Sequence, residues 1–202
     1  MTVPILILAG GASSRMGSRD KLLEPVDGQP LLRLQAWRAL KASRNVTVLT
    51  RPGRPDLQRA LAGLQVRVIA PTEAQEGIGG SIRLGTRTHL RSKCFLLVLA
   101  DLVELEAQDL RSVINARSTD ANIKIWRGAT SDGKPGHPVL FEHHVYADLL
   151  NLRGDTGAKA VMEKHADHLR LIPLPGDRAR LDLDTPEAWD SWRAKRADPQ
   201  SQ

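Results

Sequence analysis

The chain has 202 residues, a length typical of one globular domain with a sizeable core, and its formal net charge of +6 fits a protein that binds polyanions. The basic residues are scattered and aromatic residues make up only 3%, so we expect ligands carrying several phosphate groups rather than nucleic acid. No apolar run approaches the roughly 18 residues of a membrane span, and the one cysteine cannot form an internal disulfide, so we expect a cytoplasmic protein with no membrane partner.

The first part of the chain alternates apolar, β-branched runs with helix-like patterns. The runs expected to form strands are 3–8, 46–49, 66–69 and 95–99. Apolar residues spaced three or four apart predict helices within 31–40 and 57–64. Because the strands are apolar throughout, we expect them to be covered on both faces. The alternation predicts an α/β fold of three layers, Rossmann-like, with a mostly parallel sheet and helices on both faces.

After about residue 120 the rhythm loosens. Strands are expected at 123–126, 138–141 and 169–172, with a further short strand at 181–184 and a helix that begins near Pro186. No linker or internal repeat interrupts the chain. We therefore expect one domain over residues 1–196 and a frayed polar tail over residues 197–202.

A glycine-bearing loop follows the first expected strand. Gly10 and Gly11 allow the backbone to approach a ligand closely, and successive N–H groups in such a loop can bind an anion. Arg15 and Lys21 add a planar guanidinium group and a compact ammonium group, both suited to phosphate oxygens. Taken alone, the loop fits a phosphate site or a tight turn with surface cations equally well.

Two familiar glycine loops are excluded. A P-loop has four residues between its glycines and then Lys-Ser/Thr, whereas five residues separate Gly11 from Gly17 and Ser18 follows. A dinucleotide-binding loop needs Gly-x-Gly-x-x-Gly, whereas Gly10 and Gly11 are adjacent. An NAD-dependent oxidoreductase is therefore not expected.

An ordered set of motifs resembles the molybdenum cofactor cytidylyltransferases and guanylyltransferases, which belong to the glycosyltransferase-A-like nucleotidyltransferases. The set spans nearly the whole chain and comprises Leu8-Ala9-Gly10-Gly11-x-Ser13-x-Arg15-Met16-Gly17 with Lys21, Gly77-x-x-x-Ser81-Ile82-Arg83-x-Gly85, Leu99-Ala100-Asp101, Pro135-Gly136-His137-Pro138-Val139, Gly154-Asp155-x-Gly157-Ala158 and Asp182-Leu183-Asp184-Thr185-Pro186-Glu187. The resemblance implies the fold of the nucleotide-diphospho-sugar transferases.

The same resemblance implies an enzyme that transfers CMP or GMP from CTP or GTP to the phosphate of molybdopterin and releases pyrophosphate. It implies Mg²⁺ as cofactor, with Mn²⁺ as a substitute, and a downstream molybdoenzyme or its chaperone as partner. Arg15 and Lys21 would hold the triphosphate and, with Asp101, form the catalytic set. The implied nucleotide-binding residues are Leu8, Ala9, Gly10, Gly11, Ser13, Arg15, Lys21 and Ser81.

Aspartates supply the candidate metal ligands. Asp101 follows an apolar strand and should emerge at the ligand edge of the sheet, although it could instead cap the next helix. The family usually has Met-Pro after this Asp, whereas Leu102 and Val103 stand here. Related enzymes carry a second ligand just before the Thr-Pro-Glu turn, so we expect Asp182 to bind metal. Asp184 is better placed to cap the helix that begins at Pro186.

The resemblance assigns His137 and Asp155 to the acceptor side, with a plain turn histidine and a helix cap as the respective alternatives. We expect packing roles for Cys94, Trp126, Trp189 and Trp192. His143, His144, His165 and His168 are expected at the surface or on helices, with no zinc-like spacing.

The base is indicated by two features that disagree. Gly10 resembles the guanylyltransferase, whereas Ser81 and the Pro135-to-Pro138 run resemble the cytidylyltransferase. Because discrimination needs hydrogen-bonding groups that the wrong base leaves unpaired, Ser81 favours CTP. Two other functions stay open: nucleotidyl transfer to another phosphorylated acceptor such as a sugar phosphate, and non-catalytic binding of a nucleotide or cofactor, which the altered segment after Asp101 leaves possible.

Overall fold

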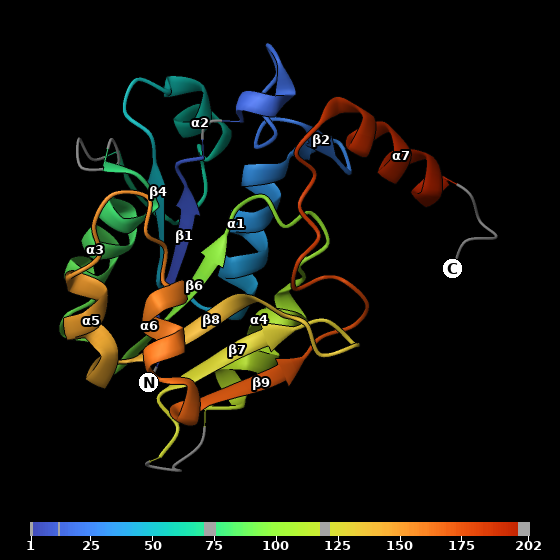
Figure 1. Cartoon of the computed structure of the whole chain (residues 1–202). Coiled ribbons are helices and arrows are strands. Elements are labelled where there is room, and N and C mark those ends of the chain that lie inside the picture. The colour runs from blue at the N-terminus through green and yellow to red at the C-terminus, as the bar shows by residue number, and fades with distance from the viewer. Residues whose placement is uncertain (1, 12, 71–75, 118–121, 198–202) are drawn as a thin grey trace.

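A mixed sheet forms the centre of the molecule (Figure 1). The computed structural model describes residues 2–11, 13–70, 76–117 and 122–197, so most of the predicted tail lies outside the described residues. Seven strands lie in the order β5-β4-β1-β6-β8-β7-β9. They are β1 (Ile5–Ala9), β4 (Val46–Thr50), β5 (Arg67–Ile69), β6 (Cys94–Leu99), β7 (Ile125–Ala129), β8 (Pro135–Glu142) and β9 (Leu169–Pro173).

The strands pair in parallel except around β8, which is antiparallel to both β6 and β7. This confirms the mostly parallel sheet expected from the sequence. The expected strand at 181–184 does not form, because only an isolated antiparallel bridge joins Leu102 to Asp182. A small hairpin of β2 (Pro25–Val26) and β3 (Gln29–Pro30), which the sequence reasoning missed, precedes the first helix.

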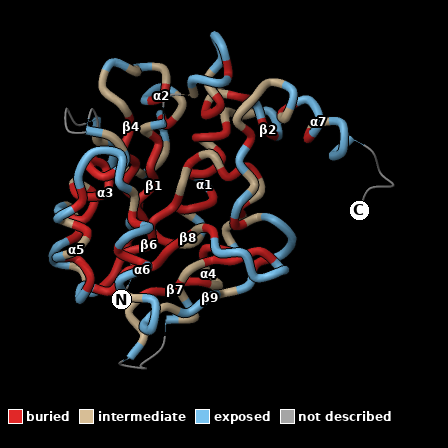
Figure 2. Tube along the Cα trace, viewed as in Figure 1, coloured by how far each residue is buried: buried red, intermediate tan, exposed pale blue. Residues whose placement is uncertain are grey.

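Helices cover both faces of the sheet because successive strand residues point to opposite sides. The α-helices are α1 (Leu31–Ala42), α2 (Pro55–Ala60), α3 (Ile78–Thr88), α4 (Ala107–Asn115), α5 (Tyr146–Leu150), α6 (Lys159–Lys164) and α7 (Pro186–Ala197). Ile5 and Ile7 of β1 pack in a core with residues of α1, α2 and α4, whereas Leu6 and Leu8 pack with residues of α3, α5 and α6. Figure 2 shows the central strands β1 and β6 as buried, whereas β9 at one edge of the sheet is more exposed.

A third core fixes the last segment of the chain. Trp189 and Trp192 of α7 pack with Leu183 and with Met16 from the loop after β1. The indole nitrogen of Trp189 also donates a hydrogen bond of 3.0 Å to the Leu183 carbonyl oxygen. The expected packing roles of these tryptophans, of Trp126 and of Cys94 are confirmed by their burial. The segment before α7 is thereby held against the loop after β1.

The topology places two loops side by side. From β1 the chain runs outward to β4 and β5, then crosses back to β6 on the other side of β1. Ligands of open α/β sheets bind at such a switch point, where loops leave the carboxyl ends of neighbouring strands. The loop at 10–20 and Asp101 leave β1 and β6 at this point. Among the described helices, none is both long and apolar enough to cross a lipid bilayer.

Candidate active site

Three carboxylates meet at the switch point. Asp101 follows β6, while Asp182 and Asp184 flank the buried Leu183 in the segment before α7. Each offers an oxygen atom, and the three atoms lie within 4.8 Å of one another. Because alternate residues of an extended segment share a side, burying Leu183 directs both aspartates toward Asp101. The predicted pairing of Asp101 with Asp182 is therefore present, together with Asp184, for which the sequence favoured a different role.

The residues after Asp101 anchor this arrangement. Leu102 forms the bridge to Asp182, and the Val103 N–H donates a 3.3 Å hydrogen bond to the Leu181 carbonyl oxygen. Proline, which the family usually has at the position of Val103, has no N–H to donate. The departure from the family pattern thus adds a bond that holds the two metal-ligand candidates together.

Lys21 lies between the carboxylates. Its Nζ donates hydrogen bonds of 2.6 Å to Asp101 Oδ2 and 2.6 Å to Asp184 Oδ1. The residue is only 9% exposed. Burial alone would lower the pKa of Lys21, but the two aspartates outweigh it and raise the pKa, so the ammonium group stays charged at neutral pH. Arg15 also pairs with Asp184, but its side chain is 70% exposed and free to turn toward a ligand.

The carboxylates carry more negative charge than Lys21 balances. Burial raises the pKa of Asp182, and the charges of Asp184 and Asp101 raise it further. Burial acts on Asp184 in the same direction, but its bond to Lys21 and the charge of Arg15 lower its pKa. Asp101 Oδ1 is buried and has no hydrogen-bond partner among the described residues. A buried, unpartnered carboxylate oxygen beside a second carboxylate is a donor set that fits a hard divalent cation such as Mg²⁺.

The loop after β1 is shaped by Asp20, a residue that the sequence reasoning missed. Its carboxylate accepts hydrogen bonds from Ser13 Oγ at 3.0 Å, from the Leu22 N–H at 2.9 Å and from Arg54 at 2.6 Å. Ser13, one of the predicted nucleotide-binding residues, therefore uses its hydroxyl group to close the loop. The only sequence signal for Asp20 is an acidic residue next to Lys21 in a loop expected to bind anions.

The other predicted nucleotide-binding residues divide into two groups. The side chains of Leu8 and Ala9 are buried in the two cores, so only their main chains can face a ligand. Gly10 lies beside Ser81 of α3: a Cβ atom placed on Gly10 would be 3.7 Å from Ser81 Oγ. The two residues that predicted different bases therefore adjoin the same space.

Arg51 also borders this space. A Cβ atom on Gly10 would lie 3.9 Å from its Cγ, and its buried Nε has no hydrogen-bond partner among the described residues. Arg51 follows β4, so its place after a strand at the ligand edge is the sequence signal that could have found it.

The two helix-capping alternatives are wrong for the aspartates of the site. Asp101 lies before α4, whose capping box is formed by Glu106 and Asp109. At α7 the capping oxygen is Thr185 Oγ1, which accepts a 3.2 Å hydrogen bond from the Ala188 N–H. Asp184 is thus free to bind Lys21. The alternative role of Asp155 as a helix cap is also absent at α6, whose N-cap is Ala158.

His137 and Asp155, both predicted to face the acceptor, lie in different places. His137 is half-buried next to Asp101 and Asp182, in a small cavity that Asp155 does not line. Burial, followed by the charge of Arg127, lowers the pKa of His137 to about 4, so its ring is neutral at pH 7. Asp155 is exposed and adjoins Gly77, just before α3.

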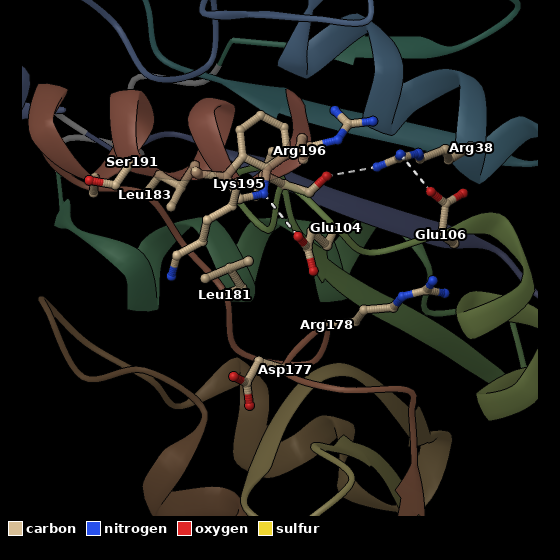
Figure 3. A pocket seen from close by; sticks show the side chains of 13 residues that line it. Arg38, Glu104, Glu106, Asp177, Arg178, Leu181, Leu183, Ser191, Lys195 and Arg196 are labelled. Carbon is tan, nitrogen blue, oxygen red and sulfur yellow. Dashed lines mark hydrogen bonds and ion pairs between the residues drawn. The ribbon is translucent and has the colours of Figure 1, made fainter. Parts of the chain in front are cut away.

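A larger cavity is not lined by any of the three carboxylates. It measures about 790 Å³ and is lined by Leu181, Leu183 and residues of α7 (Figure 3). Its charged groups are largely paired with one another or with neighbours, as Arg38 is with Glu106 at 2.7 Å. Two smaller cavities flank the carboxylates instead: about 160 Å³ beside Arg15, Lys21 and Asp184, and about 220 Å³ beside Asp101 and Asp182.

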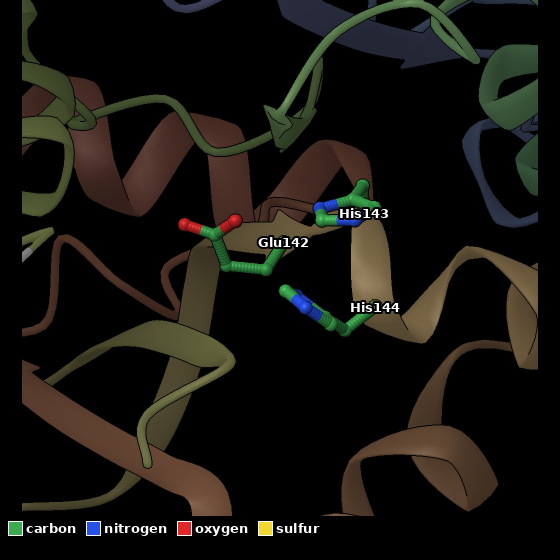
Figure 4. Close-up of side chains that lie close together, drawn as sticks. All are labelled: Glu142, His143 and His144. Atoms are coloured by element: carbon green, nitrogen blue, oxygen red, sulfur yellow. The ribbon is translucent and has the colours of Figure 1, made fainter. Parts of the chain in front are cut away.

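A second group of possible metal ligands lies elsewhere. Glu142, His143 and His144 bring their ligand atoms within 4.8 Å of one another (Figure 4), an arrangement that the sequence spacing did not predict. Both histidines are exposed, as expected, and Glu142 already accepts a 2.6 Å hydrogen bond from Arg117 Nε. Only three ligands gather in this described region, whereas structural zinc sites use four.

Comparison with known families decides among the classes that this geometry allows. The model of the MobA-like NTP transferase domain matches residues 5–169. The chain belongs to this family. Membership supports nucleotidyl transfer from a nucleoside triphosphate as the activity. No curated protein gives a significant sequence match to this MobA-like domain.

Solved structures confirm the fold of the MobA-like domain. Rv0371c from Mycobacterium tuberculosis H37Rv in complex with manganese is 22% identical, with a TM-score of 0.76 over 95% of this chain and 97% of that chain. A nucleotidyl transferase from Methanothermobacter thermautotroptrophicus is 19% identical, with a TM-score of 0.79 over 98% and 99%. CMP:2-keto-3-deoxy-manno-octonic acid synthetase complexed with CTP is 14% identical, with a TM-score of 0.77 over 98% and 99%. The expected nucleotide-diphospho-sugar transferase type is thus confirmed.

Proposed function

We propose that this MobA-like domain transfers a nucleoside monophosphate, CMP in preference to GMP, from an NTP to the terminal phosphate of molybdopterin. The observation that carries the proposal is the carboxylate group with a cavity on each side. One cavity is lined by the glycine loop, Arg15 and Lys21, and the other by Asp101, Asp182 and His137. A triphosphate donor and a phosphorylated acceptor would then approach the same carboxylates from opposite sides.

In the proposed reaction an oxygen of the acceptor phosphate attacks the α-phosphorus of the NTP. A new P–O bond forms, the bond from the α-phosphorus to the bridging oxygen breaks, and pyrophosphate leaves with that electron pair. Lys21 and Arg15 bind the β- and γ-phosphates and offset the charge that builds on the leaving group. The work of the protein is thus alignment and charge neutralisation.

Asp101 and Asp182 are proposed to hold Mg²⁺, or Mn²⁺ in its place. The buried, unpartnered Oδ1 of Asp101 supports this assignment, as does the raised pKa of Asp182, which burial and then the charges of Asp184 and Asp101 cause. A divalent cation there would neutralise phosphate charge and make the α-phosphorus more electrophilic. The manganese complex of the mycobacterial structure, which has the same fold, agrees with a divalent cation.

The proposal is tested by supplying the protein with equal CTP and GTP, Mg²⁺ and molybdopterin. We expect pyrophosphate release and, by mass spectrometry, mostly the cytosine dinucleotide. A product that is mostly the guanine dinucleotide would reverse the choice of base and indicate that Gly10 determines it. Pyrophosphate release with a sugar phosphate but not with molybdopterin would favour the alternative acceptor. Nucleotide binding without pyrophosphate from any acceptor would favour a non-catalytic relative. A downstream molybdoenzyme or its chaperone stays the proposed partner.

Gly10→Ala separates the two base assignments. The added methyl group would meet Ser81 Oγ at 3.7 Å, an ordinary contact, so the variant should fold and keep its use of CTP. A purine needs more of this space, and a methyl-sized obstruction is worth about 1–3 kcal/mol of discrimination. We therefore expect the ratio of kcat/KM for CTP over GTP to rise about tenfold. Gly11→Ala, where an added Cβ meets nothing within 4 Å, is the matched control. An unchanged ratio would remove Gly10 from the base site.

A further inference from the structure

The cavity beside Asp101 and Asp182 has two arginines in its wall. It measures about 220 Å³, and its lining includes Arg127 of β7, Arg180 from the loop after β9, and Gly136 of β8. No motif of the sequence resemblance includes either arginine. Both were therefore without a role in the function expected from the sequence.

Consecutive carbonyl groups of one short segment fix both guanidinium groups. Arg127 Nε donates a 2.9 Å hydrogen bond to the Gly136 carbonyl oxygen, and Arg180 donates one of 3.0 Å to the carbonyl oxygen of Pro135. The segment lies close to its neighbours only because it carries glycine. A Cβ atom on Gly136 would be 2.1 Å from the Ala179 carbonyl oxygen. The two cations are thus positioned by the backbone rather than by a carboxylate.

The two arginines share the cavity wall with Asp101 and Asp182 but form no ion pair with either aspartate. Within the described residues, no carboxylate lies within ion-pair distance of Arg127 or Arg180, whereas Arg15, Arg38 and Arg54 each have such a partner. Burial lowers the pKa of Arg127, and the charge of the nearby Arg180 lowers it further. Two cations that line a cavity and are held by backbone carbonyl groups rather than by ion pairs can turn their remaining N–H groups to a bound anion.

We propose that Arg127 and Arg180 form the binding site for the phosphate group of the acceptor. The inference rests on the proposed function and adds residues to its acceptor side. The carboxylate group has one pair of basic residues on each side: Arg15 and Lys21 line the donor cavity, and the two arginines line the other. Two oxygens of a phosphomonoester would bind the guanidinium groups, which leaves the third oxygen to attack the donor.

Arg127→Gln, Arg180→Gln and the double variant test the proposal in the transfer assay with CTP, Mg²⁺ and molybdopterin. Each single change should raise the KM for molybdopterin about tenfold or more, because a charge-assisted hydrogen bond is lost. The KM for CTP should change less than about twofold, since neither arginine lines the donor cavity. Lys134→Gln is the control: it removes the same charge next to Pro135, but Lys134 pairs with Asp132 at 2.7 Å outside the cavity. Equal rises in both KM values would overturn the assignment.

A binding measurement keeps this inference separate from the choice of acceptor. Inorganic phosphate is titrated calorimetrically into protein saturated with CTP, in EDTA to prevent turnover. We expect the wild-type protein and Lys134→Gln to bind phosphate, and the double variant to lose at least about tenfold in affinity. That result would support the site even if molybdopterin proved to be the wrong acceptor. Equal affinity in wild type and double variant, or no binding in either, would overturn it.

Discussion

Lys21→Met is expected to lower kcat about 30- to 1,000-fold, with a much smaller change in the KM for CTP. Removing a positive group that acts on charge formed in the transition state typically costs roughly 2–4 kcal/mol, and this loss falls on kcat. The same change should leave affinity for a divalent cation undiminished or improved. Lys21 Nζ occupies Asp101 Oδ2 and Asp184 Oδ1 at 2.6 Å each, so its removal frees both oxygens.

Steady-state kinetics and an Mn²⁺ titration followed by electron paramagnetic resonance measure these two opposite effects. Lys159→Met is the control, because that lysine is 84% exposed on α6 and, among the described residues, pairs with Glu163 in the same helix. A folded Lys21→Met protein with unchanged kcat would remove Lys21 from the catalytic site. If kcat and Mn²⁺ affinity both fall, Lys21 instead acts by holding Asp101 and Asp184 in position for the cation.

The strands β1, β4 and β6 could be predicted because each is a mostly apolar run. Val46 to Leu49 is one such run, and it forms the buried strand β4. The direction of β8 could not be predicted, because a strand pairs in either direction with the same residues. The β2–β3 hairpin was missed although the Asp27-Gly28 pair at its turn is a sequence signal of a tight two-residue turn. Both residues have the positive φ that such a turn requires.

The candidate site could be predicted where one residue follows one strand. Asp101 is such a residue, since the strand before it fixes where its carboxylate emerges. Asp184 was assigned to a helix cap because an aspartate just before Pro186 suits that role equally well. The decision depends on Lys21, 163 positions away, and on Thr185, which takes the cap instead. Such a choice between local and distant partners is made only by the fold.

The two arginines of the acceptor cavity had no sequence signal at all. Arg127 is separated from Gly136 by 9 positions and Arg180 from Pro135 by 45. Their partners are backbone carbonyl groups, which every residue has, so the sequence does not mark them. The family motif drew attention to His137 in the same segment, but its side chain is neutral at pH 7. The cations of the cavity come from neighbouring elements that this segment holds in place.

Asp101→Asn should abolish Mg²⁺-dependent turnover, with a loss of at least about a hundredfold, because a bound cation contributes several kcal/mol of charge stabilisation. The amide keeps the shape of the side chain and can still accept a hydrogen bond from Lys21, so the protein should remain folded. It loses the charge that the buried oxygen atom would offer a divalent cation. The variant should therefore also lose Mn²⁺ affinity, in contrast to Lys21→Met.

Kinetics at limiting Mg²⁺, an Mn²⁺ titration and a circular dichroism melt separate these effects on catalysis, cation binding and folding. Asp190→Asn is the matched control, since that aspartate is 72% exposed on α7 and pairs with Arg193 of the same helix rather than with a residue of the site. Near-normal turnover of Asp101→Asn at limiting Mg²⁺ would show that the cation does not depend on Asp101. Its site would then have to be built on Asp182 and Asp184 alone. If turnover is lost but Mn²⁺ affinity is intact, Asp101 does not bind the cation. Its role would then be to orient Lys21, whose ammonium group it binds on the donor side.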